Sequence, residues 1–419
     1  MFYRDDTIYC DVQMSKKTPR LEFSFPNNSN AFQFIVGVIK NVETELDQDI
    51  PVLAEALTQQ DWDEVACLAK RHRIEAQVGA TVAMLSNDIV PEHIRSNFSK
   101  IYRKNVFYGM QLRAEIHGLS KKLSEAKLDH ILLKGPAVSS RFYKDPNQRT
   151  EIDIDFWIDQ QDFLKTRELL FSSGYRQLYP EFIEQERCVG MLKSVQNSVT
   201  FGHPDIKICV DLHWRMHRNQ ALLDLDFKHE MSSASIMSIA GRDVKILSQV
   251  AHIHYLICHG AKHAWFRMKW LADLQRICAV MTDKEEQALY DMSVQHGTLR
   301  MIGTSLVLLE AVLGDQIADI NLDRWRPYAD KPLLKYISSQ LLSANGYTAS
   351  HTVSWMHKAR GPLFFWRLKR GFSYKSRVVY MTLVKVHHID ILQLSAHWKW
   401  AYCIMGLWFE FARVFMKRN

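Results

Sequence analysis

Residues 149–158 read Arg149-Thr150-Glu151-Ile152-Asp153-Ile154-Asp155-Phe156-Trp157-Ile158, and apolar and polar side chains alternate along most of this stretch. The alternation predicts a β-strand whose even-numbered positions face a core and whose other face carries Asp153 and Asp155. The Cα atoms of these two aspartates would lie about 7 Å apart on a rigid element. Two divalent ions about 4 Å apart could share such carboxylates above a phosphate group. The alternative is a solvent-exposed strand edge that happens to carry two acids.

Upstream, the apolar run His130-Ile131-Leu132-Leu133 is followed by Lys134-Gly135-Pro136. This order predicts a strand that ends at the beginning of a helix. Free backbone N–H groups at a helix N-terminus can bind a phosphate, here beside Gly135, while Lys134 adds a full positive charge. An ordinary strand-to-helix turn is the alternative interpretation.

Downstream, residues 198–201, a Gly202-His203-Pro204-Asp205 turn and residues 206–214 predict a β-hairpin. The apolar side chains of the second strand share one face. Asp211 and His213 fall on the opposite face, so a third carboxylate can join the first two if this strand pairs beside them.

These motifs together resemble the DNA polymerase β-like nucleotidyltransferase superfamily, and specifically a bacterial family known as uncharacterised nucleotidyltransferases. The resemblance covers roughly residues 120 to 275. It is carried by Leu132-Leu133-Lys134-Gly135, by Arg149 with Asp153 and Asp155, by Asp211-Leu212-His213-Trp214, and by Cys258-His259-Gly260-Ala261-Lys262-His263 with Trp270 and Asp273. The wider superfamily usually has Gly-Ser or Gly-Gly after its first strand, where this chain has Lys134-Gly135.

The resemblance implies an α+β fold, with a small mixed sheet and flanking helices embedded between N-terminal and C-terminal helical regions. It implies an enzyme that transfers a nucleoside monophosphate from a nucleoside triphosphate to a hydroxyl of a small molecule, glycan precursor or peptide. Asp153 and Asp155 would bridge two Mg2+ ions, Asp211 would complete the site, and the three acids would be the catalytic residues. Magnesium suits hard oxygen ligands that it shares with phosphates. Lys134, Gly135 and Arg149 would bind the nucleotide.

Three other functions remain open. The protein could be an inactive nucleotide-sensing or membrane-surface scaffold of the same fold. It could instead transfer the γ-phosphoryl group, because related folds can hold either phosphate over the metals. A nucleic-acid enzyme or binder is less favoured, because the sequence contains no recognised RNA-binding module.

The pattern along the chain predicts five regions. They are a polar leader (1–30), an N-terminal helical region (31–127), a nucleotidyltransferase-like catalytic core (128–245), a helical domain that completes the cleft (246–357) and a basic, aromatic-rich helical tail (358–419).

A histidine-rich helix lies in the fourth region, where His252, His259 and His263 share one face. Packing and hydrogen bonding are the favoured interpretation, because a zinc site would need a third ligand that the spacing does not supply. A second interpretation has His259, Lys262 and His263 line the nucleotide cleft together with His213.

The composition is that of a globular chain, with 419 residues, 47% hydrophobic and 24% charged. Seven cysteines without a Cys-x-x-Cys pair argue against a disulfide framework or structural zinc site. We expect a cytoplasmic protein, because the sequence begins without an apolar signal segment and has no uncharged stretch of membrane-spanning length.

Positive charge gathers at the end of the chain. Residues 358–419 contain 12 Lys or Arg and 2 Asp or Glu, a net charge of +10, although the whole chain carries +7. Aromatic side chains alternate with these bases, so the tail could bind an anionic membrane surface on the inner, cytoplasmic side, or nucleic acid. The alternative is a set of amphipathic helices that pack on the core and turn basic faces outward.

Overall fold

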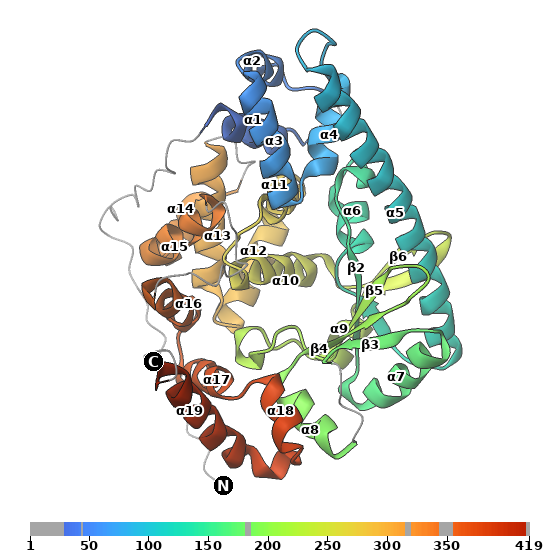
Figure 1. Ribbon diagram of the computed structural model, residues 1–419, viewed down its shortest axis with the longest axis vertical. Coiled ribbons are helices and arrows are strands. Elements are labelled where there is room, and N and C mark those ends of the chain that lie inside the picture. The colour runs from blue at the N-terminus through green and yellow to red at the C-terminus, as the bar shows by residue number, and fades with distance from the viewer. Residues whose placement is uncertain (1–28, 43–44, 181–185, 315–319, 343–354, 416–419) are drawn as a thin grey trace.

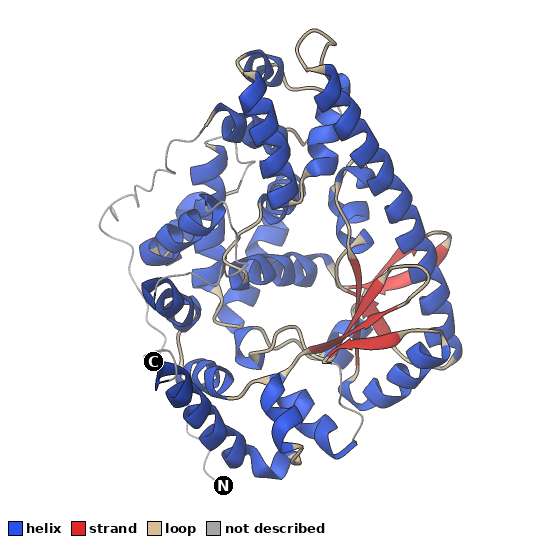
Figure 2. Ribbon diagram, viewed as in Figure 1, coloured by secondary structure: helices blue, strands red, loops and turns tan. Residues whose placement is uncertain are grey.

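The computed structural model describes residues 29–42, 45–180, 186–314, 320–342 and 355–415 (Figure 1). A single mixed sheet lies on one side of the molecule, and helices surround it (Figure 2). Most of the predicted polar leader, residues 1–28, lies outside the described residues. The predicted α+β class is confirmed.

The sheet has seven strands in the order β3-β4-β5-β2-β1-β7-β6. Their bounds are β1 His130–Leu132, β2 Asp153–Ile158, β3 Arg176–Tyr179, β4 Ser198–Gly202, β5 Cys209–His213, β6 Ser235–Ile239 and β7 Arg242–Ile246. β2 runs parallel to β5 and antiparallel to β1, and β1 runs parallel to β7. The central position of β2 therefore places its side chains between two neighbouring strands.

The sheet is buried on both faces. Ile154, Phe156 and Ile158 belong to a core that also includes residues of α5 (Glu92–Glu125) and α7 (Phe163–Ser172). This confirms the predicted core face of β2. Trp157, on the other face, belongs to a second core formed with helices of the N-terminal and C-terminal parts of the chain. Asp155 is consequently fully buried rather than exposed on an open strand edge.

The helices before the sheet are α1 Asn30–Lys40, α2 Asp49–Glu55, α3 Gln59–His72, α4 Glu75–Met84 and the long α5. After the sheet come α10 Gln249–Lys262, α11 Met268–Val280, α12 Asp283–Gln295, α13 Leu299–Leu313, α14 Leu322–Trp325 and α15 Lys331–Leu342. Both groups contribute to the second core, and α1 packs against α11 and α13. The regions before and after the sheet therefore share one apolar interior.

Within the sheet segment, α6 Pro136–Phe142 follows β1, as predicted from the Gly-Pro step, and α8 Glu186–Val195 and α9 Phe227–Ser232 are short. The C-terminal tail forms α16 Trp355–Leu368, α17 Phe372–Leu383, α18 Val386–Leu392 and α19 Lys399–Phe415, at one end of the molecule (Figure 1). In the described parts of the chain, no helix has the length and apolar character needed to cross a bilayer.

Two local features differ from the predicted pattern. In the β4–β5 hairpin the second strand begins at Cys209 instead of position 206, because Lys207 adopts a left-handed φ of 53° and its N–H donates to the carbonyl of His203. The β6–β7 hairpin was not predicted at all. Its two turn residues, Ala240 and Gly241, both have positive φ, which is the conformation that a tight hairpin turn requires.

Candidate functional site

The register of two parallel strands brings the acidic residues together. β2 pairs with β5 so that Asp155 lies opposite Asp211, Asp153 opposite Cys209 and Trp157 opposite His213. Side chains directly opposite each other point to the same face of a sheet. Asp155 and Asp211 therefore project together, as the sequence predicted from the two separate alternations.

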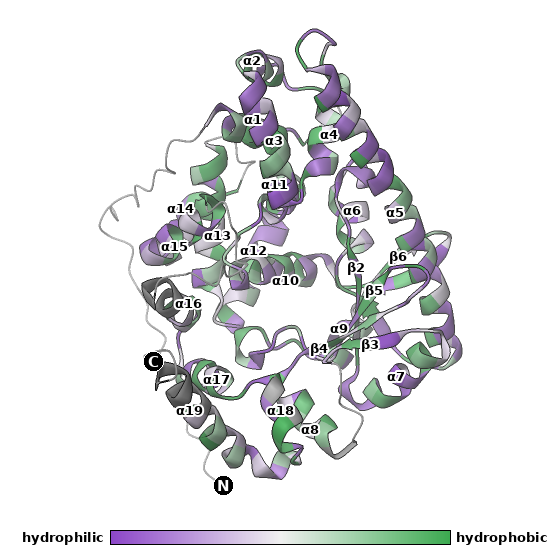
Figure 3. Ribbon diagram, in the orientation of Figure 1, coloured by the Kyte–Doolittle hydropathy of each residue, from purple (hydrophilic) through white to green (hydrophobic). Residues whose placement is uncertain are grey.

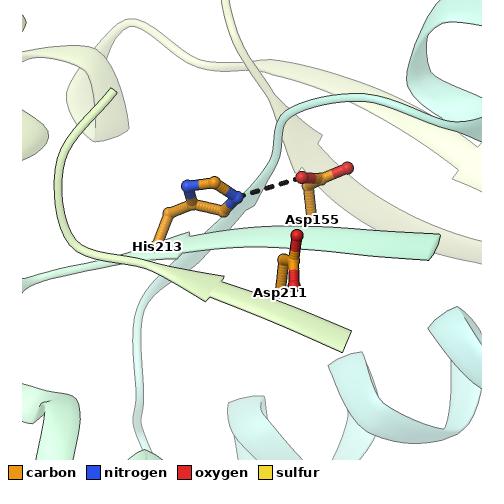
Figure 4. Close-up of side chains that lie close together, drawn as sticks. All are labelled: Asp155, Asp211 and His213. Carbon is orange, nitrogen blue, oxygen red and sulfur yellow. Dashed lines mark hydrogen bonds and ion pairs between the residues drawn. The ribbon is translucent and has the colours of Figure 1, made fainter. Parts of the chain in front are cut away.

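Three side chains each offer one potential ligand atom, and these three atoms all lie within 4.8 Å of one another. The residues are Asp155, Asp211 and His213. Figure 4 shows the His213 ring turned toward the Asp155 carboxylate, with Asp211 on the neighbouring strand. His213 Nε2 lies 3.0 Å from Asp155 Oδ1, and Lys134 Nζ lies 2.8 Å from the same oxygen. The other oxygen, Asp155 Oδ2, is buried and has no hydrogen-bond partner among the described residues.

The charges around Asp155 favour its ionised form. Burial by itself would raise the pKa of Asp155, but Lys134 and the hydrogen bond from His213 outweigh burial and hold the pKa below its usual range. Burial raises the pKa of the adjacent Asp153, and the negative charge of Asp155 adds to that shift. The two acids of the Asp-x-Asp motif therefore differ in how readily they carry charge.

Asp211 is held by the hairpin that carries it. Thr200 on β4 lies opposite Asp211 on β5, and its Oγ1 donates a 2.5 Å hydrogen bond to Asp211 Oδ1. The same hairpin orients His213, whose Nδ1 lies 3.2 Å from Asn197 Nδ2. Thr200 was not predicted as a site residue, although the register of the predicted hairpin would have placed it opposite Asp211.

These residues fit a divalent cation. Asp155 and Asp211 supply hard oxygen donors, and the unpartnered Oδ2 of Asp155 is a buried acceptor that a cation would satisfy. His213 can act as a direct ligand or as the hydrogen-bond partner that orients the Asp155 carboxylate. Asp153 lies two residues before Asp155 on the same strand and outside the group of three.

Arg149 is paired with a carboxylate of α11, although it lines the same small cavity as Lys134. The Arg149 guanidinium is buried and bonds both carboxylate oxygens of Asp273, with Nε–Oδ1 at 2.8 Å and Nη2–Oδ2 at 3.1 Å. Tyr143 also donates to Asp273, at 2.6 Å. Gly135 caps α6 with a left-handed φ of 62°, and its carbonyl accepts a 3.4 Å hydrogen bond from Arg149. Arg149 therefore links the turn after β1 to α11.

Two histidines of α10 are structural. His252 Nε2 lies 2.9 Å from the carbonyl oxygen of Leu133, and its Nδ1 accepts from Arg141 at 3.0 Å. His254 Nε2 lies 2.6 Å from Thr298 Oγ1. The interpretation that packing and hydrogen bonding explain this helix is thus confirmed for these two side chains.

The end of α10 carries a set of stacked rings beside the acids. His263 stacks on Trp270 at a centroid distance of 5.1 Å, and His259 lies between His263 and Tyr255. His259 and Trp270 also line a small cavity that Lys134 reaches. His259 and His263 both interact electrostatically with Lys134, and their predicted role in a nucleotide cleft stays a prediction.

Lys262 lies among these rings and interacts electrostatically with Asp155 and Asp211. Burial lowers the pKa of Lys262 to about 8, and the nearby Lys134 adds to that shift. The site thus contains two lysines, of which Lys134 is paired with Asp155.

Sequence reasoning missed His217 and Tyr255. His217 is buried, its ring stacks on Tyr255 at 6.1 Å, and neither ring nitrogen has a hydrogen-bond partner within the described residues. The Tyr255 hydroxyl lacks a partner there as well. Burial lowers the pKa of His217, as does the positive charge of Lys262, so the ring is neutral. No sequence motif distinguishes this histidine from the others.

Comparison with known proteins gave a family and one solved structure. The family described as "Uncharacterised nucleotidyltransferase" matches residues 58–314, more than half of the chain. An antigenic nucleotidyltransferase-like protein from Paracoccidioides brasiliensis has a crystal structure that is similar at 19% identity and a TM-score of 0.29, over 50% of this chain and 94% of that one. No curated protein sequence matches.

Proposed function

We propose that this chain, which belongs to the uncharacterised nucleotidyltransferase family, transfers a nucleoside monophosphate from a nucleoside triphosphate to a hydroxyl acceptor. Candidate acceptors are a small molecule, a glycan precursor or a peptide. One observation carries the proposal: Asp155 and Asp211 lie opposite each other on parallel strands, and Asp155 keeps one buried oxygen without a partner.

Asp153, Asp155 and Asp211 would hold two Mg2+ ions, with His213 orienting Asp155. When bound, such ions offset negative charge on the attacking and leaving oxygens of a phosphoryl transfer. The low pKa of Asp155 supports this role, because an ionised carboxylate is ready to bind a cation at neutral pH. Thr200 fixes Asp211 Oδ1 and leaves Oδ2 of that residue for the ligand.

In the proposed reaction the acceptor oxygen forms a bond to the α-phosphorus. The bond from that phosphorus to the bridging oxygen breaks, and pyrophosphate leaves with the electron pair. The acceptor proton passes to water, because Asp211 Oδ1 accepts the Thr200 hydrogen bond and Oδ2 is used for the cation. Lys134 would neutralise the triphosphate beside the turn at Gly135.

The second lysine of the site supports a polyphosphate substrate. Lys262 interacts with Asp155 and Asp211 and forms no ion pair within 4.0 Å in the described residues. A bound triphosphate would therefore supply the anion that Lys262 lacks. Arg149 was predicted to contact the nucleotide directly, and its pairing with Asp273 instead supports a positioning role at the Gly135 turn.

The test uses purified full-length protein, Mg2+ and each nucleoside triphosphate labelled separately at the α and γ positions, with a cell extract as the acceptor source. Transfer of the α label that is lost in Asp155→Asn supports the proposal. Transfer of the γ label alone would mean kinase chemistry. If neither label moves and triphosphates leave the melting temperature unchanged, the inactive scaffold is the better description.

The same proposal locates the protein in the cytoplasm, where nucleoside triphosphates are plentiful. Immunoblotting of fractionated cells that express the chain tests this location. Recovery outside the cytoplasmic and inner-membrane fractions would contradict it.

A further inference from the structure

The last helix has an apolar face that is largely exposed. Four apolar side chains form this face, and each exposes between 57% and 63% of its surface. They stand at helical spacings of four, three and one residues and are Trp400, Ile404, Leu407 and Trp408. On the opposite side Tyr402 is fully buried, and the backbone at Gly406 lies directly against Leu383 of α17. α19 therefore uses one side to pack and presents a second apolar side to the surroundings.

A second apolar surface lies nearby, between α16 and α17. A groove of about 270 Å³ is lined by Pro362, Leu363, Trp366, Val378, Val379 and Leu383. Phe372, at the start of α17, is 88% exposed. Because α17 packs against both α16 and α19, the groove and the α19 face belong to the same end of the molecule (Figure 1). Green, hydrophobic stretches are visible on α17 and α19 in Figure 3.

Positive charge surrounds these apolar surfaces. Lys375 lies 5.0 Å from the ring of Trp366, Arg370 is exposed in the turn between α16 and α17, and Lys399 is exposed at the start of α19. The whole segment from residue 358 carries a net charge of +10, whereas the preceding 357 residues sum to −3. An occupant of this surface must therefore be apolar in part and negatively charged.

We propose that α16, α17 and α19 dock on an anionic lipid bilayer, with the apolar side chains inserted at the level of the headgroups. Tryptophan favours that depth, and basic side chains around an apolar helix face are typical of interfacial helices. No spanning helix is needed, which agrees with the absence of a candidate span in the described residues. The proposal is independent of the nucleotidyltransferase reaction.

Charge and side-chain type favour this occupant over two others. A second copy of the chain would bring together two tails of the same strong positive charge, and such surfaces repel. Single-stranded nucleic acid could stack on the tryptophans, but Leu363, Val379, Ile404 and Leu407 offer no ring to a base. Hydrocarbon accommodates all of these side chains.

The experiment is co-sedimentation of the full-length protein with vesicles of neutral phosphatidylcholine and with vesicles that contain 30% phosphatidylglycerol, a fraction on the order of natural anionic membranes. We expect binding to the anionic vesicles and a blue shift of tryptophan fluorescence. A variant with Ile404→Ser, Leu407→Ser and Trp408→Ser should bind about 1000-fold more weakly, since each of the three inserted side chains contributes roughly tenfold.

A second variant, Leu363→Ser with Phe372→Ser, tests the groove independently in case the first variant is destabilised. The matched control is Phe107→Ser with Met110→Ser on α5, where both side chains are 62% exposed but lie outside the tail. This control should bind vesicles like the unmodified protein. Melting curves of all four proteins report whether each is folded.

Several outcomes would overturn the proposal. These are failure of the unmodified protein to sediment with anionic vesicles at low salt, and equal loss of binding in the α5 control. A dimer in light scattering that disappears in the α19 variant, without vesicle binding, would assign the face to a second copy. Salt-sensitive binding to oligonucleotides but not to vesicles would assign it to nucleic acid.

Discussion

Two buried ionic clusters lie within the same fold and differ in how completely their carboxylates are used. Around Asp273 both oxygens are bonded, by Nε and Nη2 of Arg149 and by the Tyr143 hydroxyl. Around Asp155 a single oxygen receives both Lys134 and His213, and Oδ2 receives nothing in the described residues. Both carboxylates are buried, so burial does not separate the proposed cation site from the structural ion pair, and the unpartnered oxygen of Asp155 is the difference between them.

The largest effect should come from Asp155→Asn. The amide cannot hold a divalent ion as a carboxylate does, so we expect transfer of the α label to fall about 10³-fold or more, about 4 kcal/mol of transition-state stabilisation. The measurement is initial rate at saturating Mg2+, with a melting curve to show that the variant is folded. Activity close to that of the unmodified protein would mean that Asp155, like Asp273, is structural.

Asp273→Asn should act on stability instead. Removing the charge leaves the Arg149 guanidinium buried without its full partner, which destabilises a protein by about 3 kcal/mol. Urea unfolding monitored by tryptophan fluorescence measures this loss. If Asp273→Asn unfolds like the unmodified protein but loses triphosphate binding, the Arg149 cluster belongs to the site and the contrast between the two clusters fails.

His252 resembles Asp273 in that all of its polar atoms are bonded, because both ring nitrogens have hydrogen-bond partners. Its imidazole stays neutral in the folded protein. Burial lowers the pKa of His252 to about 3, and Arg141 contributes to the shift. Below a pH of about 6.5, His252 binds a proton in the unfolded chain but not in the folded one. The free energy of unfolding therefore falls as the pH decreases toward 3. We expect His252 to account for roughly 2 kcal/mol of the loss between pH 6.5 and 5.

The comparison is between urea unfolding at pH 7.5 and at pH 5, in the unmodified protein and in His252→Gln. The variant cannot titrate at this position, so its stability should depend less steeply on pH. An equal dependence in both proteins would show that this histidine does not resist protonation in the folded state.

The smallest effect is expected at Thr200. Thr200→Val removes the hydroxyl that holds Asp211 and preserves the shape of the side chain, so the Mg2+ concentration for half-maximal activity should rise about tenfold. Thr200→Ser keeps the hydroxyl and serves as the control. If valine and serine behave alike, the hydrogen bond does not position the carboxylate.

Alternation along β2 and β5 was sufficient to predict that Asp155 and Asp211 share a face, because side-chain direction in a strand follows from the backbone alone. It did not predict that both faces of β2 are covered, since that depends on helices more than a hundred residues away. The β6–β7 hairpin was missed because Ala240-Gly241 is not one of the usual two-residue turn signatures such as Asn-Gly or Asp-Gly, and the positive φ of Ala240 is seen only in the structure.

Partners distant in sequence could not be predicted. The nucleotide-binding role of Arg149 stays a prediction, but the alternation in the sequence did not predict that Asp273 lies against its guanidinium. His217 was not singled out for a related reason, because only the structure shows that its buried ring nitrogens have no hydrogen-bond partner among the described residues. The five predicted regional boundaries remain predictions.

Asp155 and Asp211 can lie side by side only after β2 and β5 have paired, so this pairing determines when the acidic site forms during folding. Asp155 and Asp211 stand 56 positions apart in the chain, and β7, which completes the centre of the sheet beside β1, comes later still. On a ribosome the first acid is synthesised well before its counterpart, and pairing over such separations is slow. A nascent or truncated chain would thus carry Asp155 without Asp211 beside it, and cation binding at the proposed site would require that β2 and β5 have paired.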